Sequence, residues 1–410
     1  MPAASRRTFY AIQAAGISKF FGDNTSKERE FFRVAGLQSV GINTNFNVEA
    51  LYQLGKLDLY SNVEGIPEIE VSMEKPLDGS PLIYEMATMS RQTSAPTGAI
   101  PILTTDVLVN DPERSLIARS NARCNILLSI HSDTQSEVPA LSGAGTDASN
   151  HLVQCIVSGA YISQVSYKMG QDGNFSESAS FVANDKKWFG TGDNGFRLTA
   201  STGLPTFKPG TGTLDNARQI LRKQYVNWSG CYLPTNIPGV NSSGQFAALT
   251  ATGTVASGFA AHIQSINTSV NLGRESLNEL GRRSPYFRYV KFPVEVTTEI
   301  EVLVGGATPC DFVSATTDGA LDAAGGVNVS SESILLTLGQ AGSSTAHREM
   351  TINLGNKNVL TSVNYQGGGT DGGNSTATYS FRNFNNFTIH HALSESKLFS
   401  TYSHTLPFGV

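Results

Sequence analysis

The chain has few of the residues that mark several common classes of protein. Its 410 residues include only four cysteines, Cys124, Cys155, Cys231 and Cys310, and none of them forms a CxxC pair. We therefore expect buried, reduced thiols and no cysteine-based metal or redox site. No apolar run reaches the roughly 18–20 residues of a membrane span, so no membrane partner is expected. Residues 1–22 lack the continuous apolar stretch of a signal peptide.

Positive charge is also scarce. The chain has 29 Lys and Arg against 34 Asp and Glu, a formal net charge of −5 and a pI near 5.8. Tight DNA binding requires clustered cations that replace the counterions on the phosphates. The composition therefore argues against a nucleic-acid-coating protein. The arginine-containing stretch 112–124 has no interleaved aromatic residues for base stacking, and we interpret it as a solvated or interfacial face.

Enzyme and metal motifs are absent or incomplete. The segment GTGDNG, from Gly190 to Gly195, matches the bare dinucleotide-binding pattern but lacks a preceding apolar strand and a following helix, so we interpret it as a turn. No GxxxxGK[ST], GxSxG or HExxH motif occurs. His390 and His391 are adjacent, and in a strand they would face opposite sides and could not chelate one ion together. We expect no catalytic residues, no metal and no cofactor.

What the chain has in quantity is glycine and small polar residues. The 40 glycines, with frequent Ser, Thr and Asn, favour many short strands joined by tight turns. Residues 294–304 (VEVTTEIEVLV) alternate strictly, which is the period of a half-buried strand. The length predicts two or three domains.

An internal repeat organises the sequence. Residues 37–60 align without a gap on residues 263–286, with eight identities in 24 positions. The identical pairs are Gln38/Gln264, Ser39/Ser265, Asn45/Asn271, Glu49/Glu275, Leu51/Leu277, Leu54/Leu280, Gly55/Gly281 and Tyr60/Tyr286. After a one-residue slip, residues 69–72 align on 294–297. A second stretch, 163–181, resembles 361–381, with an offset of 198 before the glycines and 200 after them.

The repeat predicts two fused copies of one module. The expected organisation is an N-terminal arm (1–30), a first module (31–190), a linker (191–257) with a helix at 214–228, a second module (258–395) and a C-terminal tail (396–410). The first copy carries extra residues, which we assign to 132–150. In each copy Asn45 or Asn271 is expected to cap a short helix that ends at Gly55 or Gly281. The fold class is therefore mainly β, with two tandem β-sandwich or open-barrel modules, each with a short helix packed on its sheet.

The run 264–302 (QSINTSVNLGRESLNELGRRSPYFRYVKFPVEVTTEIEV) resembles a signature of the major tail tube proteins of tailed bacteriophages. In that signature, Leu-Gly-Arg-Arg leads through an aromatic Pro-Tyr segment to Phe-Pro-Val-Glu-Val-Thr. The first copy departs from it, with Lys56-Leu57 in place of Arg282-Arg283 and Asn62-Val63 in place of the aromatic pair. The resemblance covers about 40 residues closely.

The resemblance implies a structural virion protein whose strands join those of neighbouring copies into a continuous barrel around a lumen. Stacked rings would form the conduit for genome ejection into the host. Because tubes usually show six modules per ring, two fused modules imply a trimer with pseudo-sixfold symmetry. The implied partners are other copies of the chain, other tail proteins (tape measure, baseplate, terminator and, in contractile tails, a sheath), and double-stranded DNA in transit without tight binding.

Two sets of residues are candidates for function. Acidic residues on the polar face of the strand in each copy are candidates to line the lumen: Glu68, Glu70, Glu74, Glu295, Glu299 and Glu301. The alternative for these residues is a solvated sheet face or salt bridges to a neighbour. The candidates for contacts between subunits or rings are Arg282, Arg283, Arg288 and Tyr286.

Other functions remain open at this stage. A baseplate or tail-completion ring built from the same module is one alternative. A two-domain β-sandwich adhesin or carbohydrate-binding protein is another, with Tyr286, Phe287 and Tyr289 as exposed aromatic residues. A hydrolytic enzyme is the least favoured.

Overall fold

The structure is a computed structural model, and it is described here for fifteen parts of the chain. These parts are residues 13–19, 30–78, 82–88, 116–131, 151–190, 206–208, 220–226, 228–237, 240, 244, 262–282, 284–303, 332–339, 348–367 and 374–391. The proposed insertion 132–150, the C-terminal tail 396–410 and Cys310 lie outside them.

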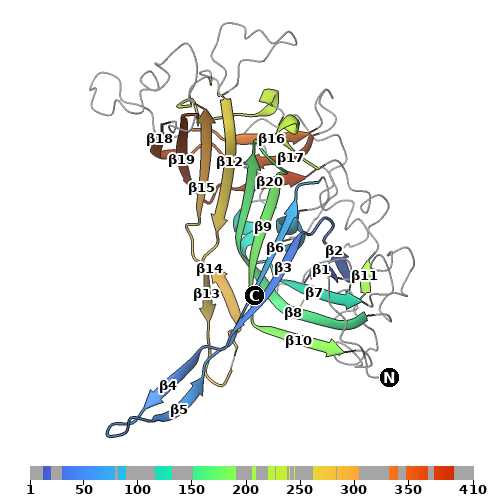
Figure 1. The fold of residues 1–410 in the computed structure, drawn as a ribbon, viewed down its shortest axis with the longest axis vertical. Coiled ribbons are helices and arrows are strands. Elements are labelled where there is room, and N and C mark those ends of the chain that lie inside the picture. Colours follow the sequence, from blue (N-terminus) through green and yellow to red (C-terminus); the bar gives the residue numbers. More distant parts are fainter. Residues whose placement is uncertain are drawn as a thin grey trace.

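The fold is mainly β, as the sequence predicts, and is dominated by a large antiparallel sheet (Figure 1). The strands of the first half are β1 (Gln13–Lys19), β2 (Glu30–Arg33), β3 (Ser39–Asn45), β4 (Val48–Tyr52), β5 (Leu59–Glu64), β6 (Glu68–Pro76), β7 (Cys124–His131), β8 (His151–Gly170), β9 (Ser176–Ala183), β10 (Asp185–Gly190) and β11 (Thr206–Lys208). The strands of the second half are β12 (His262–Asn271), β13 (Arg274–Leu277), β14 (Phe287–Val290), β15 (Glu295–Leu303), β16 (Leu335–Gly339), β17 (Arg348–Asn353), β18 (Val359–Gln366), β19 (Thr376–Phe384) and β20 (Thr388–His391). The short helices are α1 (Ile83–Ala87), α3 (Leu116–Ser120), η4 (Lys223–Tyr225) and η5 (Trp228–Gly230).

Eight strands form one continuous antiparallel path in the order β3-β6-β9-β8-β12-β15-β19-β18. The first four strands come from the first half of the chain and the last four from the second. The two halves are joined directly by the pairing of β8 with β12. We call this path the eight-stranded sheet.

The same strand arrangement occurs in both halves. β3-β6-β9-β8 corresponds to β12-β15-β19-β18, and each half has a hairpin, β4–β5 or β13–β14, at the same point in the chain. A β-bulge interrupts β8 between Ile162 and Gln164, and another interrupts β18 between Leu360 and Ser362, which is 198 residues later in both cases. At these bulges the hydroxyl groups of Ser163 and Thr361 donate to the carbonyl oxygens of Ser180 and Ser380, at 3.1 and 2.9 Å.

The strand pairs correct one alignment made from the sequence. Ile69 lies opposite Ala183, and Val296 lies opposite Asn383, which is 200 residues after Ala183. The structural counterpart of Ile69 is therefore Val296 and not Val294. Apolar-polar alternation looks the same after a shift of two residues, so the pattern alone did not fix this register. With the corrected offset of 227, Glu68 corresponds to Glu295.

The helices predicted after Asn45 and Asn271 are wrong, because these residues begin β-hairpins. The side-chain oxygen of Asn45 accepts from the backbone N–H of Asn47 at 3.1 Å, and that of Asn271 accepts from Gly273 at 3.0 Å. These bonds to the N–H two residues on form turns instead of helix caps. Gly55 and Gly281, with φ of +87° and +84°, lie in the hairpin turns and do not end helices.

Each half adds a second layer to the eight-stranded sheet. In the first half, the N-terminal part of β8 pairs with β7 and β10, and in the second half β17 pairs with β16 and β20. Each half is therefore a β-sandwich. Part of the predicted N-terminal arm is β1, which pairs with β2 and β7.

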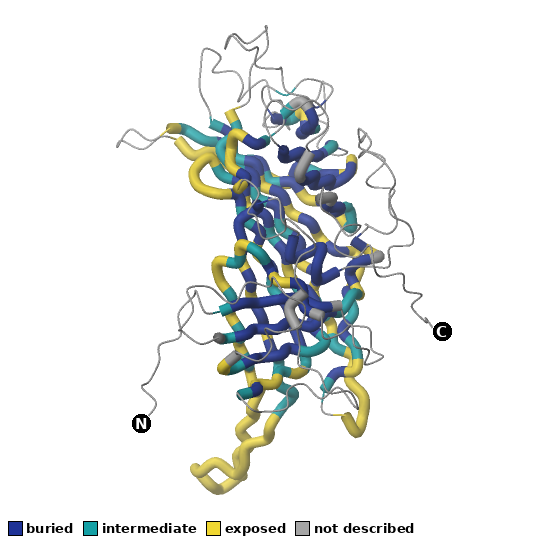
Figure 2. The backbone as a smooth tube through the Cα atoms, turned by 90° about the vertical axis from the view of Figure 1, so that its right-hand side faces the viewer, coloured by how far each residue is buried: buried dark blue, intermediate teal, exposed yellow. Residues whose placement is uncertain are grey.

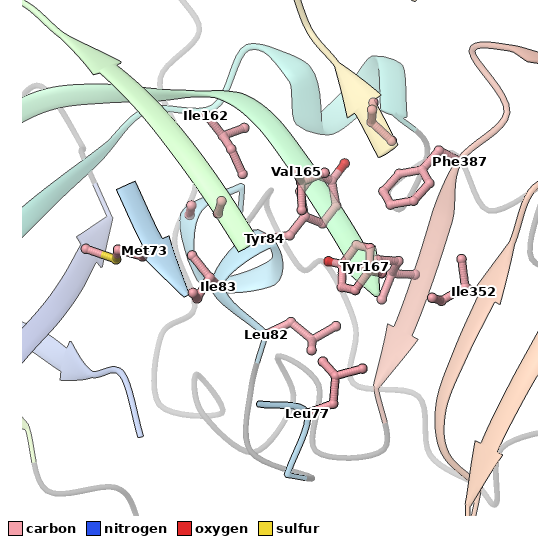
Figure 3. Close-up of a cluster of buried hydrophobic side chains, with 14 of the residues drawn as sticks. Met73, Leu77, Leu82, Ile83, Tyr84, Ile162, Val165, Tyr167, Ile352 and Phe387 are labelled. Atoms are coloured by element: carbon pink, nitrogen blue, oxygen red, sulfur yellow. The ribbon is translucent and has the colours of Figure 1, made fainter. Parts of the chain in front are cut away.

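The two halves share one buried core. Phe387, from the second half, contacts the rings of Tyr84 and Tyr167 from the first, with ring centroids 5.5 and 6.2 Å apart (Figure 3). The helix α1 is held by the buried carboxylate of Glu177, which accepts from the N–H groups of Ile83 and Tyr84 at 2.7 and 3.0 Å. Shared burial and the β8–β12 pairing fix the two halves relative to each other.

The predicted linker is partly packed against the second half. Tyr232 and Leu335 exchange backbone hydrogen bonds of 2.9 and 2.8 Å, and the carboxylate of Glu332 accepts from Thr235. The helix predicted at 214–228 is wrong where the chain is described, because residues 220–226 and 228 contain 3₁₀ turns and extended backbone. Cys124, Cys155 and Cys231 are buried, as expected from the sequence.

Candidate assembly surface

One face of the eight-stranded sheet is mostly polar, and Phe384, opposite Glu295, is an exposed apolar side chain on it. Side chains alternate along each strand, so that apolar residues point into the core and polar residues point to solvent. The uncharged polar side chains of this face are hydroxyls and amides. By strand they are Ser39, Asn43 and Asn45; Ser72; Ser178 and Ser180; Gln164 and Ser166; Ser265, Asn267, Ser269 and Asn271; Thr297; Thr378 and Ser380; and Ser362, Asn364 and Gln366.

All six predicted acidic residues lie on this polar face. Glu68, Glu70 and Glu74 are on β6, and Glu295, Glu299 and Glu301 are on β15. Two cations share the face, because Lys168 lies opposite Asn267, and Arg382 lies opposite Thr297. Arg382 approaches Glu295 to 3.8 Å. Arg288 of β14 pairs with Glu68 at 3.0 Å, and with six carboxylates against these three cations the polar face still carries net negative charge.

The eight-stranded sheet ends in two edge strands. Among the described residues, β3 pairs only with β6, and β18 pairs only with β19. The core-facing side chains of these edge strands are incompletely covered: Val40, Ile42 and Val363 are half-buried, and Tyr365 is 57% exposed. Unpaired, partly apolar edges are places where a sheet recruits further strands.

The hairpin β4–β5 is the most exposed apolar part of the described chain. It projects from one end of the molecule (Figure 1), and every residue of its two strands is exposed (Figure 2). Its large exposed apolar residues, with those at its base and tip, are Phe46, Val48, Leu51, Tyr52, Leu54, Leu57, Leu59, Tyr60 and Val63. We call residues 46–64 the first hairpin. An apolar patch of this kind marks a contact with another molecule.

The matching hairpin β13–β14 lies against the first half of its own chain. The guanidinium of Arg274 donates through Nε to the carbonyl of Ile162 at 2.8 Å and lies 5.1 Å from the ring centroid of Tyr161. Phe287 contacts the same ring at 5.7 Å. We call residues 272–290 the second hairpin. The two hairpins therefore differ in what covers them, although both follow the same point of the repeat.

The predicted contact residues separate into two groups. Arg288 is 3% exposed, and it donates to Glu68 and to Asn184 at 3.0 Å each, so the structure places it in a contact between the two halves of one chain. Arg282 pairs with Glu279 at 3.1 Å with both side chains about half exposed, and Tyr286 is 46% exposed. Arg283 lies outside the described residues.

Sequence reasoning missed the first hairpin and the two sheet edges as surfaces. The signal for the hairpin was present, because residues 46–63 carry nine large apolar side chains without the spacing of a stable helix face. The edges could not be found from sequence, since they depend on which strands remain unpaired after folding.

The comparisons with known proteins add little. No protein-family model and no curated protein matches the chain. A cryo-EM structure of the anti-feeding prophage cap (AFP tube terminating cap) has 12% sequence identity, covers 46% of this chain and 94% of that chain, and superposes with a TM-score of 0.27. A similarity this low carries no argument about function. Within the ranges given above, no helix could cross a membrane and no group of His, Cys, Asp or Glu could hold a metal ion.

The two arginines provide a direct test of this assignment. We expect Arg288→Ala to lower the free energy of unfolding of the unassembled chain by about 2 kcal/mol, because it removes charge-assisted hydrogen bonds at a buried site. Arg282→Ala, which removes an exposed pair, should change it by less than about 1 kcal/mol. Urea unfolding followed by tryptophan fluorescence measures both, and equal effects would contradict the placement of Arg288.

Proposed function

We propose that this chain is a structural subunit that closes with other copies into rings, and that stacked rings form the tail tube of a bacteriophage. The observation that carries the proposal is the eight-stranded sheet, which has one buried face, one polar face and two edges that are unpaired among the described strands. A sheet with two open edges satisfies both of them when it closes on itself through further copies. The resemblance of residues 264–302 to tail tube proteins supports the same function.

The fused repeat sets the expected stoichiometry. We interpret the shared strand order, bulge position and hairpin position of the two halves as an internal duplication. Three copies of an eight-stranded path would give a barrel of 24 strands with pseudo-sixfold symmetry. At roughly 4.8 Å between strands, the barrel would measure about 37 Å between opposite backbones before strand tilt widens it. Such a lumen admits a DNA duplex.

In this ring the polar face lines the lumen. Short hydroxyl and amide side chains offer DNA few ionic contacts, and the carboxylates repel phosphates over about 8–10 Å at physiological salt. DNA would therefore slide without being held, in line with the few cations on this face. The exposed tips of the two hairpins, with Leu54 and Leu57 on one and Arg282 and Tyr286 on the other, are the contacts proposed between rings. Arg283, which lies outside the described residues, stays a candidate from the sequence.

In this proposal the protein is not an enzyme and needs no cofactor. It functions in the virion after synthesis in the host cytoplasm, and its partners are other copies and the other proteins of the tail. A ring at the baseplate or at the end of the tail, built in the same way, is the nearest alternative. A monomeric β-sandwich that binds carbohydrate is the alternative from a different class.

Electron microscopy of the purified protein tests the proposal. We expect negative-stain images of concentrated, gently warmed protein to show hollow tubes. Short closed rings without tubes would favour the baseplate or terminator alternative. Monodisperse monomers at every concentration would contradict self-assembly and favour the carbohydrate-binding alternative, which glycan screening would then examine.

Charge reversal on the polar face tests the role of the lumen. We expect phage particles with Glu295→Lys and Glu299→Lys to have intact tails but to eject their genome more slowly, because each lysine adds a phosphate contact. The matched control, Asp172→Lys with Asp185→Lys, makes the same charge change at exposed positions outside the polar face. Ejection followed by a DNA-binding dye gives the rate, and equal rates for the two variants would contradict a lumen lined by β15.

A further inference from the structure

The pairing of β8 with β12 shows how two halves of this fold join. Val165 lies opposite Val270 and Tyr167 lies opposite Thr268, and all four side chains are at most 1% exposed. Just beyond the paired strands, the N–H of Leu272 donates to the carbonyl of Ser163 at 2.8 Å. Leu272 is 1% exposed. This internal junction therefore has a fixed register, a buried core side and a buried leucine at its end.

The repeat places counterparts of these residues at the two free edges. Subtracting 226 converts β12 to β3, and adding 198 converts β8 to β18, as the shared residues and bulges require. The counterpart of Tyr167 is Tyr365, whose exposure is 57% instead of 1%. The counterpart of Leu272 is Phe46, whose exposure is 64% instead of 1%. Side chains that the internal junction buries are thus left uncovered at both edges.

We propose that β18 of one copy pairs antiparallel with β3 of the next in the register of the internal junction, and this rests on the proposed function. Thr44 lies opposite Val363 of the neighbouring copy, Asn43 opposite Asn364, and Ile42 opposite Tyr365. The N–H of Phe46 donates to the carbonyl of Thr361, as that of Leu272 does to Ser163. Phe46 fills the position that Leu272 fills inside the chain.

The sequence of the edges fits this register. On the core side Ile42 and Tyr365 take the places of Thr268 and Tyr167, and Thr44 and Val363 take the places of Val270 and Val165. Asn43 and Asn364 meet on the polar face. A slip of one residue would set Ile42 opposite Asn364 or Gln366, and so join the core face of one copy to the polar face of the next. A slip of two residues would separate Phe46 from the bulge at Thr361.

The proposed pairing of β18 with β3 also places the first hairpin on the neighbouring copy. The second hairpin, β13–β14, lies along the first half of its own chain through Arg274 and Phe287. The first hairpin stands in the same relation to β3 as the second does to β12. It would therefore lie along the second half of the adjacent copy, which accounts for its exposed apolar residues in a single chain.

Paired cysteines test the register in assembled rings. Asn43→Cys with Asn364→Cys brings two thiols to directly opposite positions, with Cβ atoms about 4.5–5.5 Å apart. The control pairs, Asn43→Cys with Ser362→Cys and Asn43→Cys with Gln366→Cys, are diagonal, at about 7–8 Å or less. A crosslink within one chain is excluded because β3 and β18 are seven strand spacings apart, roughly 34 Å along the sheet.

The native thiols interfere little with this experiment. Burial raises the pKa of Cys124 to about 12 and that of Cys155 to about 11, which keeps these groups in the unreactive thiol form. The unsubstituted chain, oxidised in parallel, corrects for any contribution of Cys231 and Cys310.

We expect copper-phenanthroline oxidation of rings to crosslink the opposite pair about tenfold more than either diagonal pair, up to covalent trimers on a non-reducing gel. Greater crosslinking of a diagonal pair, or none from any pair in rings that form, would overturn the register while leaving the proposed function intact. If the unsubstituted chain forms no rings or tubes, the proposed function itself fails.

A second variant gives a readout that does not depend on disulfide chemistry. Phe46→Ala should raise the protein concentration needed for assembly by about tenfold or more, because the side chain becomes buried only between copies. Its melting temperature as a monomer should stay unchanged, since Phe46 is 64% exposed there. Ile117→Ala, at a similarly exposed position on α3, is the control. An equal effect of both substitutions on assembly would overturn the proposal.

Discussion

The constraint on which this structure depends is the need of a β-strand edge for hydrogen-bonding partners. Inside the chain, β8 and β12 satisfy that need for each other and make one sheet from two halves. The strands at the ends of the sheet, β3 and β18, correspond to β12 and β8 in the repeat, and each pairs on one side only among the described residues. The pairing of β8 with β12 satisfies two strand edges within the chain, and the same kind of pairing between copies would satisfy the outer edges of β3 and β18.

The two faces of the eight-stranded sheet have different roles. The buried face carries one core that runs through both halves and includes the contact of Phe387 with Tyr84. The polar face has hydroxyls, amides and six carboxylates but few cations, which supports the proposal that it faces DNA in transit. Because side chains alternate along a strand, one sequence pattern produces both faces, and a register error of one residue would exchange them.

Much of the fold could be predicted from the sequence because its signals are periodic. The alternation in residues 294–304 predicts β15, and the glutamates assigned to the polar side of the strand in each copy lie on the polar sides of β6 and β15. The hairpins could not be distinguished from helices, since Asn45 and Gly55 are residues that serve equally at helix ends and in turns. Isolated helices of two turns are marginal, and here hairpin pairing stabilises the alternative.

The parts of the candidate surface that sequence could not predict are those set by long-range pairing. Arg288 belongs to a motif that resembles a tail tube signature, yet only the folded chain brings it to Glu68, 220 residues away. The open edges and the uncovered first hairpin likewise depend on what each strand meets. Which strands and side chains meet across such distances in the sequence depends on the whole fold, and local residue patterns do not predict it.

The rotational symmetry of assembled rings tests the central claim most directly. Cryo-EM averages of the tubes viewed end-on should show three copies of the chain per ring, six similar lobes and an unbroken inner wall of 24 strands in which β18 meets β3. A ring with gaps between chains, or one in which another surface joins the copies and both edges stay free, would contradict the account.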